Sequence, residues 1–136
     1  MVIGAIREAT AGETRVGLTP EVAGKFIAQG ARILLQRGLG TAAQFPDAAY
    51  GGLPAESLAW ADDADSVLSG ADVMLTVQPL SVAQIGRLKA GATVVGFLQA
   101  HARQDEVRAL RDRGITSLAV EFVPRISRAQ SMDALS

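Results

Sequence analysis

Five short apolar runs, several of them separated by helix-length segments, constrain the fold more than any other feature of this sequence. Most of the runs are rich in β-branched residues, as strands buried on both faces of a sheet usually are. Strands that alternate with helices in this way form a parallel sheet with crossover helices. The runs cover residues 2–6, 31–35, 73–77, 93–98 and 115–120.

Capping residues predict where the helices begin and end. Thr19 followed by Pro20 is typical of an N-cap and a first helical residue. Ser81 with Gln84 three positions later forms the pattern of a capping box. Gly114 is typical of a helix C-terminus. Helices are therefore predicted from residue 20 to about Gly30, from residue 82 to about Lys89, and over residues 104–113.

The alternation weakens between Gly38 and Leu58, where Pro46, Pro54 and the Gly51-Gly52 pair exclude a long helix. We expect short helical turns and loops there. With 136 residues, the chain is long enough for one domain with its own core. The prediction is a single α/β domain over residues 1–136 with three layers, in which helices cover both faces of a parallel sheet.

The composition excludes several function classes. The formal net charge is −1, with 13 basic and 14 acidic residues intermixed, so no basic face for nucleic acid is expected. The absence of cysteine excludes disulfides, thiolate metal sites and cysteine nucleophiles. No apolar run approaches the ~18 residues that a membrane span requires, so no direct membrane insertion is expected.

Residues 38–43, G-L-G-T-A-A, match the dinucleotide fingerprint G-x-G-x-x-A after a predicted strand, with Asp62 and Asp63 about 20 residues further on. The fingerprint requires a helix of several turns whose N-terminus faces the pyrophosphate. Pro46 interrupts any such helix almost at once. We therefore predict that this segment does not bind a nucleotide.

No metal site is predicted. His101 is the single histidine and is expected on the surface or at a helix entry. Asp62, Asp63 and Asp65 lack the glycine and terminal glutamate of a calcium loop, and a solvated helix start explains them better. Arg15, in the loop before the first helix, either contacts a substrate anion or pairs with Glu8 or Glu13.

The C-terminal stretch is unusual in its polar pattern. In a helix, Gln130, Asp133 and Ser136 recur every three residues and share one side, and Arg125 lies just before the helix. They follow a buried strand, at the carboxyl end where parallel sheets place their sites. The alternative is an ordinary solvent-exposed face. The helix is predicted to be cut in its first turns at Ser136.

Two segments carry a family resemblance. Residues 7–20, R-E-A-T-A-G-E-T-R-V-G-L-T-P, and residues 124–136, P-R-I-S-R-A-Q-S-M-D-A-L-S, resemble the signatures that bound the first domain of the alanine dehydrogenase and transhydrogenase α-subunit superfamily. Residues 71–79, A-D-V-M-L-T-V-Q-P, and 94–99, V-V-G-F-L-Q, also fit. The last signature is specific to the branch of proton-translocating NAD(P) transhydrogenases.

The resemblance implies a flavodoxin-like (Rossmann-like) first domain, followed by a Rossmann domain and by a segment that returns to complete the first domain. On this basis the chain is expected to be incomplete at its C-terminus. NAD(H) lies between the domains, with its phosphates on the second. By motif, Arg125, Gln130 and Asp133 orient the nicotinamide for catalysis, and these three residues together with Ser136 contact the cofactor.

The resemblance also implies a reaction and partners. Hydride passes between NAD(H) here and NADP(H) on a β component, coupled to proton movement through a membrane-spanning subunit. The α subunits are expected to form homodimers at the cytoplasmic face of the cell membrane. The fragment alone is expected to be inactive.

Two alternatives remain open, a non-catalytic α/β binding module and a fragment of an alanine dehydrogenase-like enzyme. In the resemblance, Arg15 matches an arginine of alanine dehydrogenase. However, the family's lysine and histidine correspond to Gln78 and Gln99. A neutral amide neither supplies a cation for a carboxylate nor acts as an acid or base near neutral pH, which disfavours amino-acid dehydrogenase chemistry.

Overall fold

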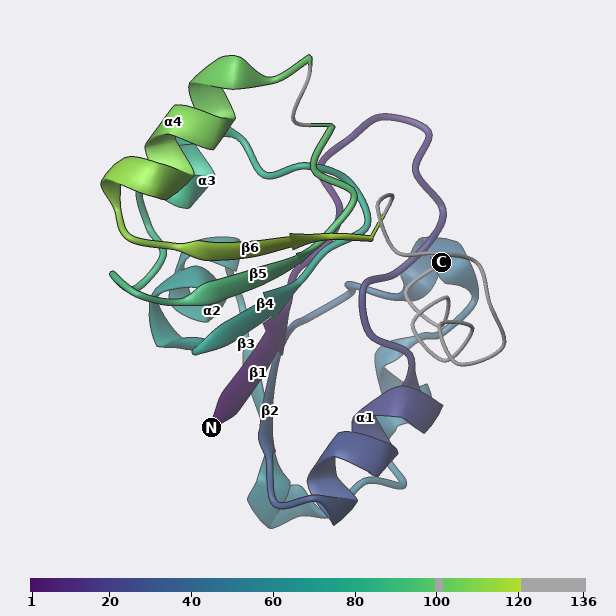
Figure 1. Ribbon diagram of the computed structural model, residues 1–136. Helices are drawn as coiled ribbons and strands as arrows, with labels where there is room; N and C mark the ends of the chain where they lie inside the picture. The colour runs from purple at the N-terminus through teal and green to yellow at the C-terminus, as the bar shows by residue number, and fades with distance from the viewer. Residues whose placement is uncertain (100–101, 121–136) are drawn as a thin grey trace.

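The computed structural model describes residues 1–99 and 102–120. In this part of the chain, strands alternate with helices or with short 3-10 turns, and Figure 1 shows the strands side by side in one sheet. The strands are β1 (Val2–Ala5), β2 (Arg32–Gln36), β3 (Leu58–Ala61), β4 (Val73–Leu75), β5 (Thr93–Gly96) and β6 (Thr116–Ala119). The helices are α1 (Pro20–Ala28), α2 (Ala64–Gly70), α3 (Val82–Ile85) and α4 (Gln104–Asp112), with 3-10 turns η1 (Thr41–Ala43), η2 (Asp47–Tyr50) and η3 (Ala55–Ser57).

All strand pairs are parallel, and the strand order is β3-β2-β1-β4-β5-β6. The chain builds outward from β1 to β3 on one side, and then crosses to β4 and builds outward to β6 on the other. Without β3, the five strands predicted from the sequence have the flavodoxin-like order 2-1-3-4-5. The predicted α/β class is therefore confirmed, with one additional strand at the edge.

The additional strand, β3, is not among the strands predicted from the sequence. Its sequence Leu58-Ala59-Trp60-Ala61 contains no β-branched residue, and Ala59 is exposed. It pairs only with β2 among the described strands, from Ile33↔Leu58 to Gln36↔Ala61. An edge strand of this kind lacks the continuous apolar run that identifies a central strand.

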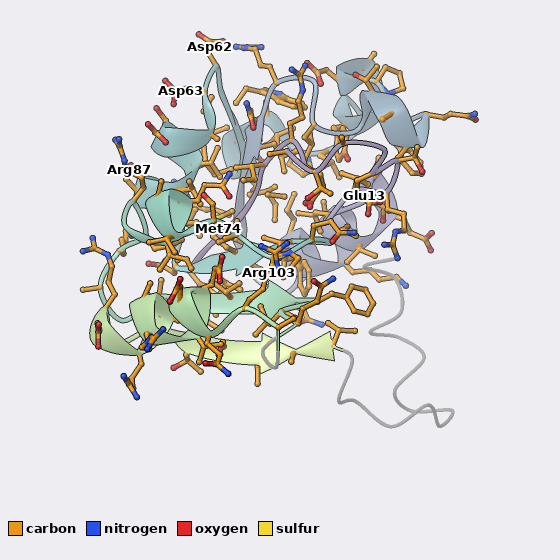
Figure 2. All side chains as sticks on the ribbon, turned by 90° about the horizontal axis from the view of Figure 1, so that it is seen from above. Glu13, Asp62, Asp63, Met74, Arg87 and Arg103 are labelled. Carbon is orange, nitrogen blue, oxygen red and sulfur yellow. The ribbon has the colours of Figure 1, made fainter. Side chains whose placement is uncertain are left out.

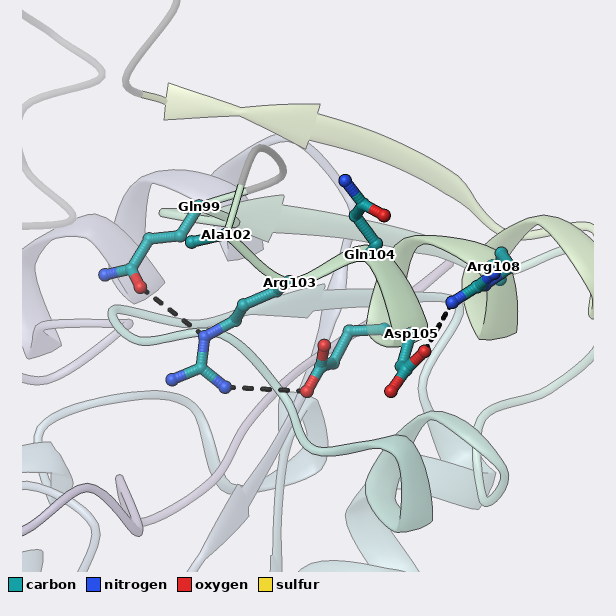
Figure 3. Close-up of a pocket in the computed structure, with 7 residues that line it drawn as sticks. Gln99, Ala102, Arg103, Gln104, Asp105 and Arg108 are labelled. Atoms are coloured by element: carbon teal, nitrogen blue, oxygen red, sulfur yellow. Dashed lines mark hydrogen bonds and ion pairs between the residues drawn. The ribbon is translucent and has the colours of Figure 1, made fainter.

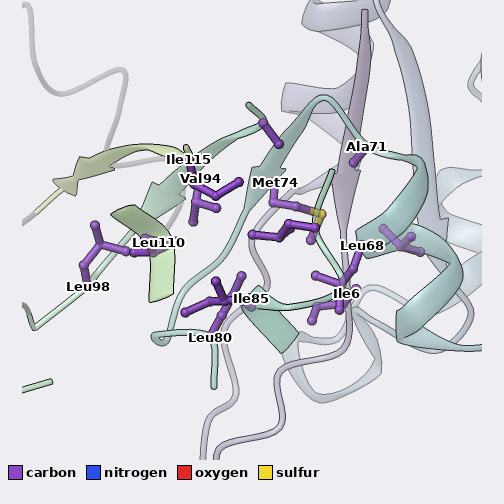
Figure 4. Packing of buried hydrophobic residues seen from close by; sticks show 13 residues of the cluster. Ile6, Leu68, Ala71, Met74, Leu80, Ile85, Val94, Leu98, Leu110 and Ile115 are labelled. Atoms are coloured by element: carbon purple, nitrogen blue, oxygen red, sulfur yellow. The ribbon is translucent and has the colours of Figure 1, made fainter. Parts of the chain in front are cut away.

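Helices cover the two faces of the sheet unequally. In Figure 1, α2, α3 and α4 lie on one face and α1 lies on the other. The first face carries a core of apolar side chains around Met74, Leu68 and Leu110, shown in Figure 4. The second core contains Ala23 of α1 and Tyr50 of η2. Both faces of the central strands are thus buried, which explains their continuous apolar sequences.

The capping predictions are confirmed, but one helix is shorter than expected. Thr19 caps α1 by accepting a hydrogen bond from the Val22 N–H at 3.3 Å, and Ser81 and Gln84 form a complete capping box. However, α3 ends at Ile85 and not near Lys89. Gly86 follows directly, and glycine has low helix propensity.

The segment between β2 and β3 forms three short 3-10 turns, as predicted for residues 38–58. Tyr50 anchors them. Its hydroxyl is buried and donates to the carbonyl of Leu18 at 2.7 Å, and its ring meets Trp60 edge-on with 5.7 Å between centroids. Burial raises the pKa of the Tyr50 hydroxyl to about 12. This hydrogen bond fixes the turns against the loop that follows β1.

Candidate functional site at the switch point of the sheet

The strand order reverses between β1 and β4, and open parallel sheets bind ligands at this switch point, beyond the carboxyl ends of the strands. The loops after these two strands meet closely here. A Cβ on Gly17, in the loop after β1, would lie 2.4 Å from the carbonyl oxygen of Leu75 at the end of β4. Glycine is therefore required where the first loop passes the end of β4.

Glu8 joins the two loops. Its carboxylate accepts hydrogen bonds from two consecutive backbone N–H groups, of Val77 at 3.1 Å and of Gln78 at 2.8 Å. Burial raises the pKa of Glu8, although the two N–H donors act in the opposite direction. The structure thus places a half-buried carboxylate against two amides of the loop that follows β4.

Glu13 lies beside it and accepts from three groups. The guanidinium of Arg15 donates through Nε at 3.0 Å and Nη2 at 3.1 Å, the Arg15 backbone N–H donates at 2.7 Å, and the side-chain amide of Gln78 donates at 2.7 Å. The Arg15 side chain is the main reason that the pKa of Glu13 falls to about 2. Glu13 is therefore ionised throughout the physiological range.

The sequence allows Arg15 either to contact a substrate anion or to pair with Glu8 or Glu13. In the structure it forms an ion pair with Glu13. The Glu13 side chain is 5% exposed and that of Arg15 is 42% exposed. The guanidinium carbon also lies 5.6 Å from the ring centroid of Phe97, at the end of β5. We refer to Glu8, Glu13, Arg15 and Gln78 as the switch-point cluster.

Thr76, directly after β4, and Gly96, the last residue of β5, approach each other closely. The hydroxyl of Thr76 is buried and has no hydrogen-bond partner in the part of the chain that the structure describes. A Cβ on Gly96 would lie 2.2 Å from that hydroxyl oxygen. Glycine at position 96 is thus needed for the two strands to end side by side.

The loop after β5 carries Gln99, which adopts a left-handed backbone with φ 51°. Its side-chain oxygen accepts from Arg103 Nε at 3.4 Å, and Arg103 also pairs with Glu106 at 3.6 Å (Figure 3). These three side chains line an open cavity of about 580 Å³ at the start of α4. Gln78 and Gln99 therefore both lie at carboxyl ends of strands, but Gln78 contacts Glu13 whereas Gln99 contacts Arg103.

The segment that resembles a dinucleotide fingerprint does not form a phosphate loop. After Gly38 (φ 78°) it enters only the three-residue turn η1. The N–H of Gly38 donates to the carboxylate of Asp47 at 2.8 Å, and no helix of several turns follows to offer its N-terminus to a pyrophosphate. The expectation that no long helix follows these glycines is confirmed, and the absence of nucleotide binding here stays a prediction.

The acidic group before α2 is the predicted helix start. Asp63 is its N-cap and accepts from the Ser66 N–H at 2.7 Å, while Asp62 pairs with Arg37 at 2.8 Å. Figure 2 shows Asp62 and Asp63 at the periphery and Met74 in the interior. Within residues 1–99 and 102–120, no acidic or histidine cluster could hold a metal ion.

Several predicted residues lie outside the described part of the chain. They are His101, Arg125, Gln130, Asp133 and Ser136. Conversely, the sequence suggests Glu8 and Glu13 only as partners for Arg15. An acidic residue three positions after a buried strand at a switch point is the signal that could have identified Glu8. No helix in the described ranges is long and apolar enough to cross a membrane.

Comparisons with known proteins agree with this architecture. The family model described as alanine dehydrogenase/PNT, N-terminal domain, matches residues 4–136. The NAD(P) transhydrogenase subunit alpha of Cereibacter sphaeroides is 36% identical over 136 residues, covering 100% of this chain and 25% of that protein. The alanine dehydrogenase of Bacillus subtilis (strain 168) is 32% identical over 123 residues, covering 90% and 32%.

Among solved structures, the transhydrogenase from Sinorhizobium meliloti superposes with a TM-score of 0.86 and 28% identity, covering 98% of this chain and 39% of that one. The present chain spans about a quarter to a third of the length of the curated relatives named above. The sequence match, the sheet order and the loops at the switch point lead to one conclusion. This chain belongs to the alanine dehydrogenase/PNT N-terminal domain family.

Proposed function

We propose that this chain forms the N-terminal portion of the NAD(H)-binding component of a proton-translocating, Re/Si-specific NAD(P) transhydrogenase. The similarity to transhydrogenase subunit alpha over the whole chain supports this proposal most directly. The switch point adds support, because it presents Gln78 and an Arg15 neutralised by Glu13. An enzyme that reduces a keto acid grips the substrate carboxylate with cations, and Gln78 is a neutral amide at the position where the resemblance implies a lysine.

The described residues fit one end of the cofactor. Only the three-residue turn η1 follows Gly38, so the glycine-containing loop lacks the helix N-terminus that a dinucleotide pyrophosphate requires. The polar side chains at the switch point suit the carboxamide of the nicotinamide, which is uncharged in both NAD⁺ and NADH. We therefore assign the phosphates to a Rossmann domain that follows in the complete protein.

By motif, Arg125, Gln130 and Asp133 orient the nicotinamide ring, and Ser136 contacts the cofactor beside them. Bound NAD(H) supplies the hydride chemistry itself. The chain then needs no nucleophile or general acid, only accurate placement of the ring and exclusion of water. The amide of Gln130 offers both donors and an acceptor for the nicotinamide carboxamide or the ribose.

The proposal extends to the assembly. NADP(H) is bound by a β component, and a membrane-spanning subunit couples hydride transfer to proton movement. Two α subunits form a homodimer. The component is cytoplasmic and is held peripherally at the inner face of the membrane through these partners.

The test uses this chain joined to the rest of its α subunit and mixed with an NADP(H)-binding component. Hydride transfer between NADH and an NADP analogue should be measurable, whereas the 136-residue chain alone should show no turnover and little or no NADH binding. Supplying pyruvate, ammonia and NADH to the same protein should give no reaction. Amination of pyruvate without transhydrogenation would refute the proposal in favour of an amino-acid dehydrogenase.

Gln130→Asn tests the residue assignment in the same protein. The shorter side chain withdraws the amide by one methylene, so hydride transfer should slow about ten-fold or more, while NADH affinity changes little. Stopped-flow single turnovers beside equilibrium titration measure both quantities. Transfer at the unmodified rate, or a parallel loss of affinity, would remove Gln130 from the proposed site.

A further inference from the structure

We propose that Glu8 is a positioning residue for hydride transfer, because its carboxylate fixes the loop after β4 and, through that loop, the orientation of Arg15 against the end of β5. This role rests on the proposed function, since hydride transfer is the activity that it serves. Glu8 makes no contact with the cofactor in this role. It acts on the reaction only through the protein groups that it holds.

Glu8 takes the place of a strand partner for the loop after β4. Strand β1 ends at Ala5, and its pairing with β4 is registered at only two residue pairs. Beyond these pairs, the N–H groups of Val77 and Gln78 donate to the Glu8 carboxylate at 3.1 and 2.8 Å. One side chain thus does for this loop what a backbone acceptor does inside the sheet.

The backbone of Val77 is held from both sides. Its N–H donates to Glu8, and its carbonyl accepts from the N–H of Phe97, directly after β5, at 3.3 Å. The Val77 side chain is buried. A backbone N–H that loses its acceptor away from water costs free energy. The loop is therefore expected to shift toward water or another acceptor when the Glu8 carboxylate is removed.

Gln78 is restrained at three points. Its N–H donates to Glu8 at 2.8 Å, and its side-chain amide donates to Glu13 at 2.7 Å. Pro79 follows it and favours an extended backbone at Gln78. Both hydrogen bonds lead to the loop after β1. A shift of the Gln78 backbone on loss of Glu8 would therefore withdraw the side-chain amide from Glu13.

The contacts return to the loop after β4 through Arg15. Glu13 engages the Arg15 guanidinium at 3.0 and 3.1 Å, and the guanidinium carbon lies 5.6 Å from the centroid of the Phe97 ring. The backbone of Phe97 in turn donates to Val77. A closed circuit thus joins the carboxyl ends of β1, β4 and β5, made by Glu8, Val77, Phe97, Arg15, Glu13 and Gln78. A change at Glu8 therefore reaches all three loops.

Loss of Glu8 should affect the rate of transfer more than the affinity for NADH. Hydride transfer is sensitive to small displacements of the groups that place the reacting ring. In the proposed function a following Rossmann domain holds the phosphates, and Glu8 does not contact that domain's ligand. A loss of folded protein, by contrast, would lower the number of NADH sites and the rate in proportion.

The activity test uses this chain joined to the rest of its α subunit, mixed with an NADP(H)-binding component. Glu8→Ala should slow single-turnover hydride transfer by about ten-fold or more, the scale on which mispositioning acts. Glu8→Gln keeps one acceptor oxygen and should recover part of that rate. Rates are divided by the concentration of NADH sites from equilibrium titration, in which the affinity should be nearly unchanged.

A second readout needs no cofactor. In the same α subunit, ¹H–¹⁵N NMR of Glu8→Gln should show shifts of the Phe97 backbone amide and of the Arg15 Nε–H, two groups that Glu8 does not bond. Glu56→Gln is the matched control, since Glu56 is exposed in η3, before the start of β3. It should change neither these signals nor the rate of transfer.

A double variant tests whether the circuit acts as one unit. Gln78→Met removes the amide that links the loop after β4 to Glu13. The losses of rate caused by Glu8→Gln and Gln78→Met should combine to less than their product, whereas independent sites would multiply. If Glu8→Ala fails to fold, Glu8→Gln and this double variant decide the question, because Gln has nearly the shape of Glu.

Unmodified rates in the folded Glu8 variants, a parallel loss of rate and affinity, unshifted Phe97 and Arg15 signals, or multiplying effects in the double variant would each overturn the positioning role. An unmodified α subunit that transfers no hydride would refute the transhydrogenase assignment itself, and the positioning role with it. The rate of the unmodified protein therefore distinguishes the two failures.

Discussion

Gln78 donates its side-chain amide to Glu13 across 65 residues of sequence, with 2.7 Å between Nε2 and Oε1. Strands β1 and β4 are registered at only two positions, Ile3↔Val73 and Gly4↔Met74. Side-chain hydrogen bonds beyond their carboxyl ends therefore add to this short pairing between the two halves of the sheet.

Gln78→Met tests this contribution. Methionine keeps the length of the side chain but removes the donor to an ionised partner, which should lower the free energy of unfolding by about 2 kcal/mol. Urea denaturation measures the change. Gln104→Met, at an exposed position on α4, is the control and should have little effect. Equal stabilities of the two variants would contradict a structural role for the Gln78–Glu13 bond.

Glu13 should make the free energy of unfolding depend on pH. Its pKa of about 2 in the folded protein lies below the ordinary value of 4.5, so its contribution is present above about pH 5 and is lost as the pH falls toward 2. Glu13→Gln should therefore be less stable than the unmodified chain near neutral pH, and the difference should narrow in acid. Urea titrations at several pH values measure this difference.

The contribution of Glu8 to stability should change with pH in the opposite direction. Burial raises its pKa, so folding favours its protonated form and its contribution to stability increases as the pH falls below its folded pKa. In Glu8→Gln this acid-side gain should be absent. Parallel pH profiles for the Glu8 and Glu13 variants would show that the two carboxylates do not occupy the different environments described above.

Gly96→Ala should be strongly destabilising. The added methyl would lie 2.2 Å from the Thr76 hydroxyl and 2.5 Å from the Thr76 carbonyl oxygen, and the latter belongs to the backbone and cannot rotate away. Overpacking of this kind costs about 1–3 kcal/mol or more. Gly52→Ala, where nothing lies within 4 Å of the new methyl, should be nearly neutral in the same thermal unfolding experiment.

Tyr50→Phe removes one hydroxyl and leaves the buried carbonyl of Leu18 without its 2.7 Å donor. We expect the free energy of unfolding to fall by about 1–2 kcal/mol. Trp60, which contacts the Tyr50 ring, provides the fluorescence signal for the denaturation curve. An unchanged midpoint would mean that water replaces the hydroxyl as the donor to Leu18.

The parts of the fold that depend on continuous burial could be predicted from the sequence. The central strands and the capped helix starts at Thr19 and Ser81 are examples, because burial on both faces and capping leave local patterns. Strand β3 escaped prediction because its alternation of exposed and half-buried residues is too short and too rich in alanine. Tertiary pairing with β2, and not local propensity, makes it a strand.

The candidate site was only partly predictable for a similar reason. Arg15 could be located in a ligand-facing loop, but its partner depends on which loop the sheet order brings beside it. The bond from Glu8 to Val77 spans 69 residues, and no local pattern encodes such a distance. Arg125 and Gln130 were assigned by family motif, and their assignment remains a prediction.

The central place of β1 also affects how the chain folds during synthesis. Strand β1 pairs with β2 and with β4. The ribosome completes β2 at Gln36, but it reaches β4 only at Val73. Roughly 40 residues of translation separate the end of β2 from β4, which takes roughly 2–8 s at about 5–20 residues per second. During that interval the most buried strand of the finished domain has an open, apolar edge. A nascent chain stalled before Val73 should therefore bind chaperones or aggregate more readily than one released after β4 has emerged.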